Sequence, residues 1–244
     1  MPVMLEAVLL IASRNPSWTY GDGPTTLVIM AKTKLHTDDA TIRAAVAAER
    51  RELADLLVRL PEERWDEPTL CTGWRVREVA AHMSFGFRYP MRKVVGELVR
   101  ARGSMDRMTD RVARREAAEM SRQEMASALR ENADHPWTPP VGGFAAALGH
   151  DVVHGLDITI PLGLDRQVPE DRLRIVLGTA SPMGARFFGA KLGGVRLRAD
   201  DLEWSYGTGS EVTGRPQDLV AVLFGRKVPA GRLRGAEAGR FTSA

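Results

Sequence analysis

The sequence is poor in cysteine and contains no long apolar run, and both absences narrow the classes of protein that it can encode. Cys71 is the only cysteine, which excludes an internal disulfide and a cysteine-rich metal site. No stretch approaches the roughly 20 apolar residues that span a bilayer, so we expect no membrane partner. The apolar run at the start of the chain is interrupted by Glu6 and follows no basic residue, unlike a secretory signal. The sequence therefore predicts a cytoplasmic protein.

The chain also lacks a large excess of charge of one sign. Its formal net charge is +3, from 34 basic and 31 acidic residues. Arginines alternate with acidic residues between Arg111 and Glu119, which is typical of a solvated helix face and not of a nucleic-acid-binding stripe. We therefore expect no nucleic-acid partner. Hydrophobic residues make up 44% of the chain, enough for the core of one large domain or two smaller ones.

The first part of the chain shows no sustained periodicity. It contains Gly, Pro, Thr and Ser around positions 18–26, and Met30 opens a segment that resembles an ordinary protein start. We interpret residues 1–35 as a disordered extension or as the product of an upstream start codon. Mass spectrometry of the native N-terminus distinguishes the two interpretations for residues 1–29.

Helical periodicity dominates residues 36–163, which predicts a four-helix bundle. Asp38 supplies a capping oxygen for a first helix that ends before Pro61. A second helix starts after Gly73 and is kinked or ended by Pro90.

The remaining helices of the predicted bundle follow the same rules. Residues 91–102 can resume as helix, and a capping box at Ser121 opens a third bundle helix that runs to Asn132. Residues 144–162 form a fourth helix that is apolar on nearly all sides, so it is expected in the bundle interior.

The pattern changes after residue 163, and the chain as a whole reads as mainly α with a small α+β part. Residues 169–188 predict a helix, and residues 215–225 predict a short one that begins at a proline. Alternating segments between them predict strands at 195–198, 202–206 and 210–213. We expect residues 164–230 to form a small α/β domain packed against the bundle, and residues 231–244 to form a flexible tail.

Three of the five histidines fall near the centres of predicted bundle helices, His82 on the second and His150 and His154 on the fourth. Because His150 and His154 are four residues apart, they share one helix face and can bind one ion. A ligand from a facing helix would complete the site, as in other bundle cores. The fourth position would remain for water or substrate, which is typical of a catalytic metal site.

The alternative is that the histidines are hydrogen-bonded core residues, since a lone His-x-x-x-His pair is common by chance. The apolar neighbours of His150 and His154 favour the metal, because unpaired imidazoles would be costly there. Asp157 can either orient a ligand imidazole or form a plain salt bridge with an arginine, and the sequence leaves both open. His36 and His135 receive no role.

The segment from His150 to His154 superficially resembles the zinc-peptidase motif, which requires Glu at its second position. Asp151 stands there instead and is one methylene shorter. We interpret Asp151 as facing solvent, and a peptidase is not expected.

The segment from Trp65 to Met83 resembles the first signature of the mycothiol-dependent maleylpyruvate isomerase family, one of the DinB-like metal-binding bundles. It carries Cys-x-Gly-Trp, followed by His82 eight residues after the Trp. His150-x-x-x-His154-x-x-Asp157 is similar to the second signature. The third resembles Leu202-x-Trp204 through Gly214, Asp218-Leu219 and Leu223-Phe224-Gly225-Arg226.

The resemblance implies a DinB-like four-helix bundle followed by a small C-terminal α/β domain related to sterol-carrier domains. It implies a divalent metal, most often Zn²⁺, held by His82, His150 and His154. It also implies mycothiol as the thiol cofactor, since a metal-coordinated thiol is deprotonated outright. By the same resemblance Arg226 binds the carboxylates of a substrate, although it could equally complement a helix dipole.

One position departs from the isomerase pattern, because His150 stands where the isomerase has a glutamate. The neutral imidazole raises the charge of the site by one unit and removes a possible proton acceptor. Metal binding survives this change, while isomerisation of maleylpyruvate itself is put in doubt. We interpret Cys71 as a small packed residue and not as a nucleophile.

Three functions stay open at this point. The first is a metal-dependent isomerase or thiol transferase that joins a low-molecular-weight thiol to a small-molecule electrophile. The second is a non-catalytic module that binds a small ligand, with a structural metal or none. In the third, the metal only cross-links the bundle, and the protein fills all four ligand positions. The sequence leaves the substrate and the metal open, as well as the choice between monomer and homodimer.

Overall fold

The computed structural model describes residues 37–243, and the predicted extension over residues 1–35 lies outside them. The N-terminal part is helical, with α1 (Asp39–Arg59), the 3-10 helix η1 (Glu62–Asp66), α2 (Val76–Arg88), α3 (Met91–Arg100), α4 (Met105–Glu119), α5 (Arg122–Glu131) and α6 (Gly143–Thr159). The C-terminal part contains α7 (Glu170–Gly178), α8 (Pro182–Phe187), β1 (Val195–Ala199), β2 (Ser205–Gly207), β3 (Ser210–Gly214), α9 (Pro216–Leu223), β4 (Val228–Pro229), β5 (Leu233–Arg234), η2 (Ala238–Phe241) and β6 (Thr242–Ser243). The predicted fold class, mainly α with a small α/β part, is confirmed.

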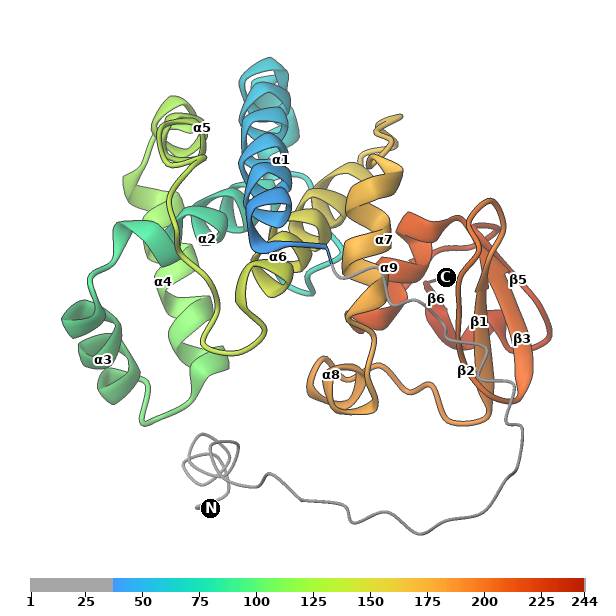
Figure 1. The fold of residues 1–244 in the computed structure, drawn as a ribbon. Coiled ribbons are helices and arrows are strands. Elements are labelled where there is room, and N and C mark those ends of the chain that lie inside the picture. The colour runs from blue at the N-terminus through green and yellow to red at the C-terminus, as the bar shows by residue number, and fades with distance from the viewer. Residues whose placement is uncertain (1–36, 244) are drawn as a thin grey trace, which may run out of the picture. The chain divides into compact units, whose positions relative to one another are not determined.

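The bundle forms where the apolar periodicity predicts it. Helix α1 packs against α5 and α6, while α2 packs against α4, α5 and α6 (Figure 1). The predicted caps are present, because Asp38 accepts a hydrogen bond from the backbone N–H of Thr41 and Ser121 forms a capping box with Glu124. Pro90 ends α2, and the chain resumes as α3 at the next residue. Helix α6 is buried along most of its length, as its apolar composition predicts.

Helix α4 adds to the predicted bundle. The sequence identifies only residues 121–132 as the third bundle helix, whereas α4 and α5 occupy this position in succession, separated by Met120 and Ser121. The alternating charges of α4 cover one face only, and its other face buries Met108, Val112, Ala113 and Ala117. Because α4 is rich in arginine, this apolar face is hard to recognise in the sequence.

The C-terminal part is built on a four-stranded sheet with the order β2-β1-β3-β5. Strand β1 is parallel to β3 and antiparallel to β2, and β3 is antiparallel to β5. The alternation of β1 buries Val195, Leu197 and Ala199, and α9 packs against both β1 and β3. A separate pair joins β4 and β6 in parallel.

Two details of the prediction for this part are wrong. The helix expected over 169–188 is broken into α7 and α8, because Ser181 caps a new helix and Pro182 occupies its first position. The tail expected over 231–244 is instead folded over its described residues. Leu233 and Phe241 are buried in the same core as α9, and β6 pairs with β4. Its elements are two to four residues long, too short to show a periodic pattern.

One hydrophobic core joins the bundle to the C-terminal part, and a second lies within the bundle. The first core includes residues of α1, α6, α7, α9 and the sheet, and α6 lies between the bundle helices and the pair α7 and α9 (Figure 1). Buried ion pairs reinforce the junction, since Glu49 of α1 bonds Arg166 and Arg172 at 2.6 and 2.7 Å. The division into domains at residues 163 and 164 stays a prediction, because the core runs across it.

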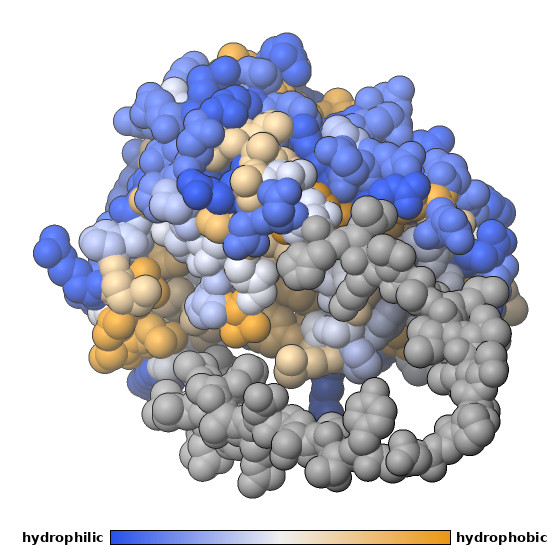
Figure 2. All heavy atoms as spheres, in the orientation of Figure 1, coloured by the Kyte–Doolittle hydropathy of each residue, from blue (hydrophilic) through white to orange (hydrophobic). Residues whose placement is uncertain are grey.

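Polar and apolar residues gather in different places on the face shown in Figure 2. Figure 2 shows hydrophilic residues over α1 and α5, and hydrophobic residues where α3 lies, whose Met91, Val95 and Val99 are exposed. No helix within residues 37–243 is both long and apolar enough to cross a membrane.

Candidate metal centre

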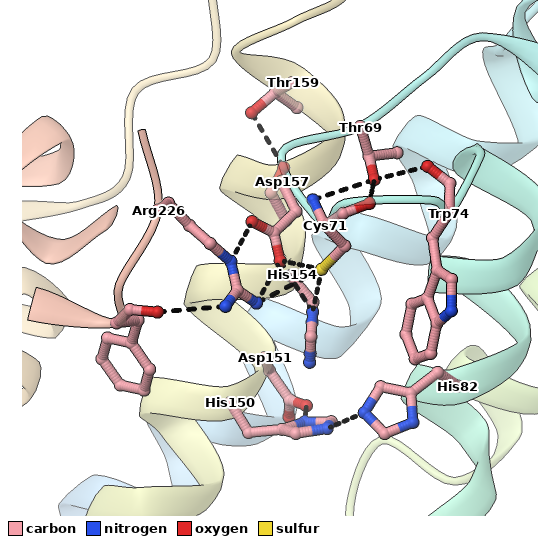
Figure 3. Close-up of polar contacts among 12 residues, drawn as sticks. Thr69, Cys71, Trp74, His82, His150, Asp151, His154, Asp157, Thr159 and Arg226 are labelled. Atoms are coloured by element: carbon pink, nitrogen blue, oxygen red, sulfur yellow. Dashed lines mark hydrogen bonds and ion pairs between the residues drawn. The ribbon is translucent and has the colours of Figure 1, made fainter. Parts of the chain in front are cut away.

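The three predicted histidines meet where α2 packs against α6. His82 comes from α2, and His150 and His154 lie one turn apart on α6 (Figure 3). One ring nitrogen from each lies within 4.8 Å of the others. The ring centroids are 5.2 Å apart for His82 and His150, 4.8 Å for His82 and His154, and 4.7 Å for His150 and His154. The structure thus brings together imidazoles that are separated by up to 72 positions in the sequence.

The spacing of these nitrogens suits a tetrahedral ion. The Nε2 atoms of His82 and His150 are 3.3 Å apart. A tetrahedral ion with metal–nitrogen distances near 2.0–2.1 Å separates its ligand nitrogens by about 3.4 Å. His154 is buried, while His82 and His150 are partly exposed. The triad therefore has a side that a further ligand can reach from solvent.

A carboxylate orients His150 through its far nitrogen. Nδ1 of His150 lies 2.8 Å from Asp151, and Asp151 accepts a 2.8 Å hydrogen bond from Nε of Arg50. Arg50 also donates to the backbone oxygens of Asn132, Ala133 and His135. Both members of the ion pair are buried. The interpretation of Asp151 as a solvent-facing residue is therefore wrong, because the crossing of α1 and α6 places Arg50 beside it.

A second carboxylate holds His154 in the same way. Asp157 lies 2.9 Å from Nδ1 of His154, and the Arg226 guanidinium donates to both of its oxygens, at 2.8 and 2.9 Å. The Cys71 thiol donates to Asp157 at 3.0 Å and accepts from Arg226 at 3.2 Å. Figure 3 shows these four side chains converging from α6, the connector before α2 and the segment after α9. Both interpretations of Asp157, as the orienting group of an imidazole and as the partner of an arginine, agree with the geometry, because it contacts His154 and Arg226 together.

The protonation states fit neutral imidazoles at neutral pH. Burial lowers the pKa of His154 to about 4 and places the pKa of His82 well below its ordinary value. Burial alone would raise the pKa of Asp157, but hydrogen bonds from Arg226 and His154 hold it below its ordinary range. Since an ionised Asp157 only accepts, Nδ1 of His154 carries the proton and Nε2 presents its lone pair.

Cys71 is protonated in this arrangement. Burial, and then the charge of Asp157, raise the pKa of its thiol far above the ordinary value. Cys71 lies 4.0 Å from Nδ1 of His154, the nitrogen that already faces Asp157. These three side chains form a second geometric group that could hold an ion. We interpret this group as a hydrogen-bonded cluster, because Arg226 already occupies both oxygens of Asp157.

The connector before α2 holds Cys71 in place. The Thr69 hydroxyl accepts from the backbone N–H of Cys71 and donates to the carbonyl of Trp74, at 3.2 and 2.9 Å. Gly73 has a φ of +80°, which favours glycine at this turn. The N–H of Leu70 donates to the carbonyl of Asp157 at 3.1 Å and so ties the connector to α6. The Cys-x-Gly-Trp string is thus a turn that presents a thiol to the site.

Sequence reasoning finds some of these residues and misses others. It identifies the triad, Asp157 and Arg226, which the structure brings together, but it treats Cys71 as mere packing. The two-point pairing of Arg226 with Asp157 leaves its guanidinium little capacity for the predicted contact with a substrate carboxylate. His135 contributes its carbonyl to Arg50 and stands outside the triad. His36 lies outside the described residues.

Comparisons with known proteins agree with the fold. Residues 46–158 match the family model described as "Mycothiol maleylpyruvate isomerase N-terminal domain". Similar solved structures are the mycothiol-dependent maleylpyruvate isomerase and a histidine-to-alanine mutant of it. Each is 12% identical, with a TM-score of 0.53 over 82% of this chain and 93% of that chain, a likeness that shows the fold alone. No curated protein matches the chain significantly. Residues 46–158 therefore form a domain of the mycothiol maleylpyruvate isomerase N-terminal family.

Proposed function

We propose that this protein is a metal-dependent enzyme that holds a divalent ion with His82, His150 and His154 and uses it with a low-molecular-weight thiol. The convergence of the three ring nitrogens within 4.8 Å carries the proposal. Zn²⁺ suits three neutral imidazoles, although such a site accepts other divalent ions. By family, the thiol is mycothiol, the second substrate is a small electrophile, and the chemistry is isomerase or thiol-transferase chemistry. A cytoplasmic location is part of the same proposal.

The side chains around the triad support this function physically. When bound, the ion supplies the positive charge that keeps a thiol deprotonated at neutral pH. Asp151 and Asp157 fix the tautomers of His150 and His154, so that Nε2 of each faces the ion. Among the described residues the triad group has three members, which leaves a fourth position for thiol, water or substrate. This observation favours a catalytic site over a structural one.

Metal analysis of the native protein tests the proposal. The chain is purified without chelator or added metal, and its metal content is measured by mass spectrometry beside that of His82→Ala. We expect about one ion per chain, as in other mononuclear sites, and its loss in His82→Ala. His135→Ala is the matched control, because it removes a histidine outside the triad. A wild-type protein without metal, or a His82→Ala protein that retains it, contradicts the proposal.

Turnover separates an enzyme from a binding module. Electrophiles are screened with and without a thiol, and we expect thiol-dependent product formation that His82→Ala abolishes. A stoichiometric ion without any thiol-dependent turnover would leave the non-catalytic module as the better description.

A further inference from the structure

A cleft with a volume of about 500 Å³ lies where α3 ends and α4 begins (Figure 1). The carboxylate in its lining, Asp110, already accepts from Nε1 of Trp74 at 2.8 Å and pairs with Arg114 at 2.9 Å. The side chains of Arg100 and Arg111 are 66% and 40% exposed, so a solute can reach them. Four arginines thus dominate a lining that consists of Arg100, Ala101, Arg102, Arg107, Asp110 and Arg111.

Positive charge exceeds negative charge over the whole junction between α3 and α4. Residues 97–115 contain six arginines and three acidic residues. Of these acids, Glu97 is buried and bonded by Arg111 and Arg115, whereas Asp106 is exposed. Even with all three carboxylates ionised, arginines remain in excess. The junction therefore attracts an anion from outside the protein.

The guanidinium groups of the cleft retain donors that the protein does not use. Arg107 gives Nε and one terminal nitrogen to the carbonyl of Ala101, at 3.2 and 3.1 Å, which leaves its other terminal nitrogen. Arg111 donates to Glu97 from one terminal nitrogen, while its Nε is buried and has no acceptor within residues 37–243. A buried donor without an acceptor is costly. Arg111 therefore has hydrogen-bonding capacity to offer to a ligand.

The backbone of Arg102 indicates that its side chain has a use. Its φ is +53°, and among residues 37–243 it is the one non-glycine residue in the left-handed region. Glycine, as at Gly103 directly after it, adopts this region without steric cost, whereas arginine is disfavoured there. Backbone strain of this kind is often retained at functional positions. The arginine at this turn adds a cation to the cleft that glycine would not supply.

We propose that this cleft is a binding site for a phosphate-bearing anion. The planar guanidinium group pairs with phosphate oxygens through two parallel hydrogen bonds, and several arginines around one cleft suit a group with more than one negative charge. A free phosphate compound and a lipid head group share this chemistry. The site uses none of the three histidines of the triad, so it goes beyond the proposed function and does not depend on it.

Calorimetry with inorganic pyrophosphate tests the site on the full chain as purified. We expect binding at low ionic strength that weakens as salt is added, and a loss of about three- to tenfold in affinity in Arg102→Gly and in Arg100→Gln. Arg196→Gln is the matched control, because it removes an exposed arginine from β1. An equal loss in Arg196→Gln, or unchanged binding in both cleft variants, overturns the proposal.

Two further measurements exclude other causes of the binding. His82→Ala should bind pyrophosphate as the wild type does, and a loss there would place the anion on a metal at the triad and overturn the proposal. Arg102→Gly should keep the urea midpoint of the wild type, because glycine relieves the left-handed backbone while it loosens the unfolded chain. If its midpoint falls, Arg100→Gln alone decides, since that side chain contacts Glu97 at only 3.5 Å.

Vesicles distinguish the two sources of the phosphate. Sedimentation is measured with vesicles of phosphatidylglycerol and, as the uncharged reference, of phosphatidylcholine. Binding to phosphatidylglycerol that Arg102→Gly weakens more than Arg196→Gln identifies a lipid head group. Binding of pyrophosphate without binding of the vesicles identifies a soluble phosphate compound. Absence of binding to both pyrophosphate and phosphatidylglycerol overturns the proposal and leaves the proposed function untouched.

Discussion

Two candidate ligand histidines on one helix are each held by an aspartate–arginine pair, and the two pairs differ in where their arginines come from. His150 is held by Asp151 with Arg50 of α1, entirely within the bundle. His154 is held by Asp157 with Arg226, which belongs to the C-terminal part. The Arg50 side chain is 0% exposed, against 20% for Arg226. Half of the candidate metal centre is therefore fixed by the bundle itself, and the other half depends on how the C-terminal part docks.

The two arginines also differ in how firmly they are held. Arg50 is also held by three backbone carbonyls between α5 and α6, so its pair with Asp151 has little freedom. Arg226 is held at one backbone carbonyl, that of Phe224, and otherwise by Asp157 and Cys71. Movement of the segment after α9 would act directly on the carboxylate that orients His154. The C-terminal part thus contributes to the candidate metal centre without supplying one of its three histidines.

Substitution of the two arginines should have the largest effects on the free energy of unfolding. Arg50→Leu leaves the buried Asp151 uncompensated, and we expect a loss of about 3–5 kcal/mol in the free energy of unfolding. Arg226→Leu leaves the equally buried Asp157 with its remaining contacts to His154 and Cys71, so a smaller loss of about 1.5–3 kcal/mol is expected. Urea unfolding of both variants beside the wild type gives the two values. An equal or larger loss in Arg226→Leu would show that the bundle half is not the more rigid one.

The pH dependence of stability gives the next largest effect. In the folded, metal-free protein the pKa of His154 is about 4, against an ordinary value of 6.5. Between these values the unfolded chain binds a proton that folded His154 does not, so stability falls as the pH falls. The contribution of His154 is complete above pH 6.5, and about 3 kcal/mol is lost by pH 4.

Urea unfolding of chelator-treated protein at several pH values between 7 and 4 measures this loss. His154→Gln lacks the titrating group and should show a shallower decline over the same range. Parallel curves for the two proteins would mean that His154 is not held neutral by burial. The lowered pKa of His82 acts with the same sign, so a residual slope is expected in His154→Gln.

Substitution of the two carboxylates should lower metal affinity by similar amounts. Asp151→Asn and Asp157→Asn each weaken the orientation of one imidazole, and each should lower metal affinity by about 10- to 100-fold. Competition with a chromogenic chelator measures both affinities. An unchanged affinity in either variant would show that its carboxylate does not orient the imidazole it contacts.

The sequence predicts the bundle and the triad because both depend on local spacing. Helix periodicity identifies α1, α2 and α6, and the four-residue interval of His150 and His154 places them on one face. The expected burial of α6 is confirmed for the same reason. Position on an apolar helix thus carries much of the information about the ligands.

The residues that sequence reasoning misses are joined by contacts between distant segments. Arg50 reaches Asp151 across 101 positions, and Arg226 reaches Cys71 across 155. No periodicity predicts such pairs, because they arise from helix crossing and from the docking of the C-terminal part. An aspartate directly after a histidine, such as Asp151, also lacks the three- or four-residue spacing that marks helix neighbours.

Substitution of Cys71 should have the smallest effect on stability, and the metal content of the variants distinguishes between the two halves of the site. Its thiol gives Asp157 one hydrogen bond, while Arg226 and His154 give three more. Cys71→Ala should therefore cost only about 1 kcal/mol of stability and leave the metal content unchanged. Its sulfur faces Nδ1 of His154, so it cannot share an ion with the Nε2 atoms of the triad. Loss of the ion in both Cys71→Ala and Cys71→Ser would identify Cys71 as a ligand and move the centre from the bundle half to the half held by Arg226, whereas retention in Cys71→Ser would indicate a hydrogen-bonding role.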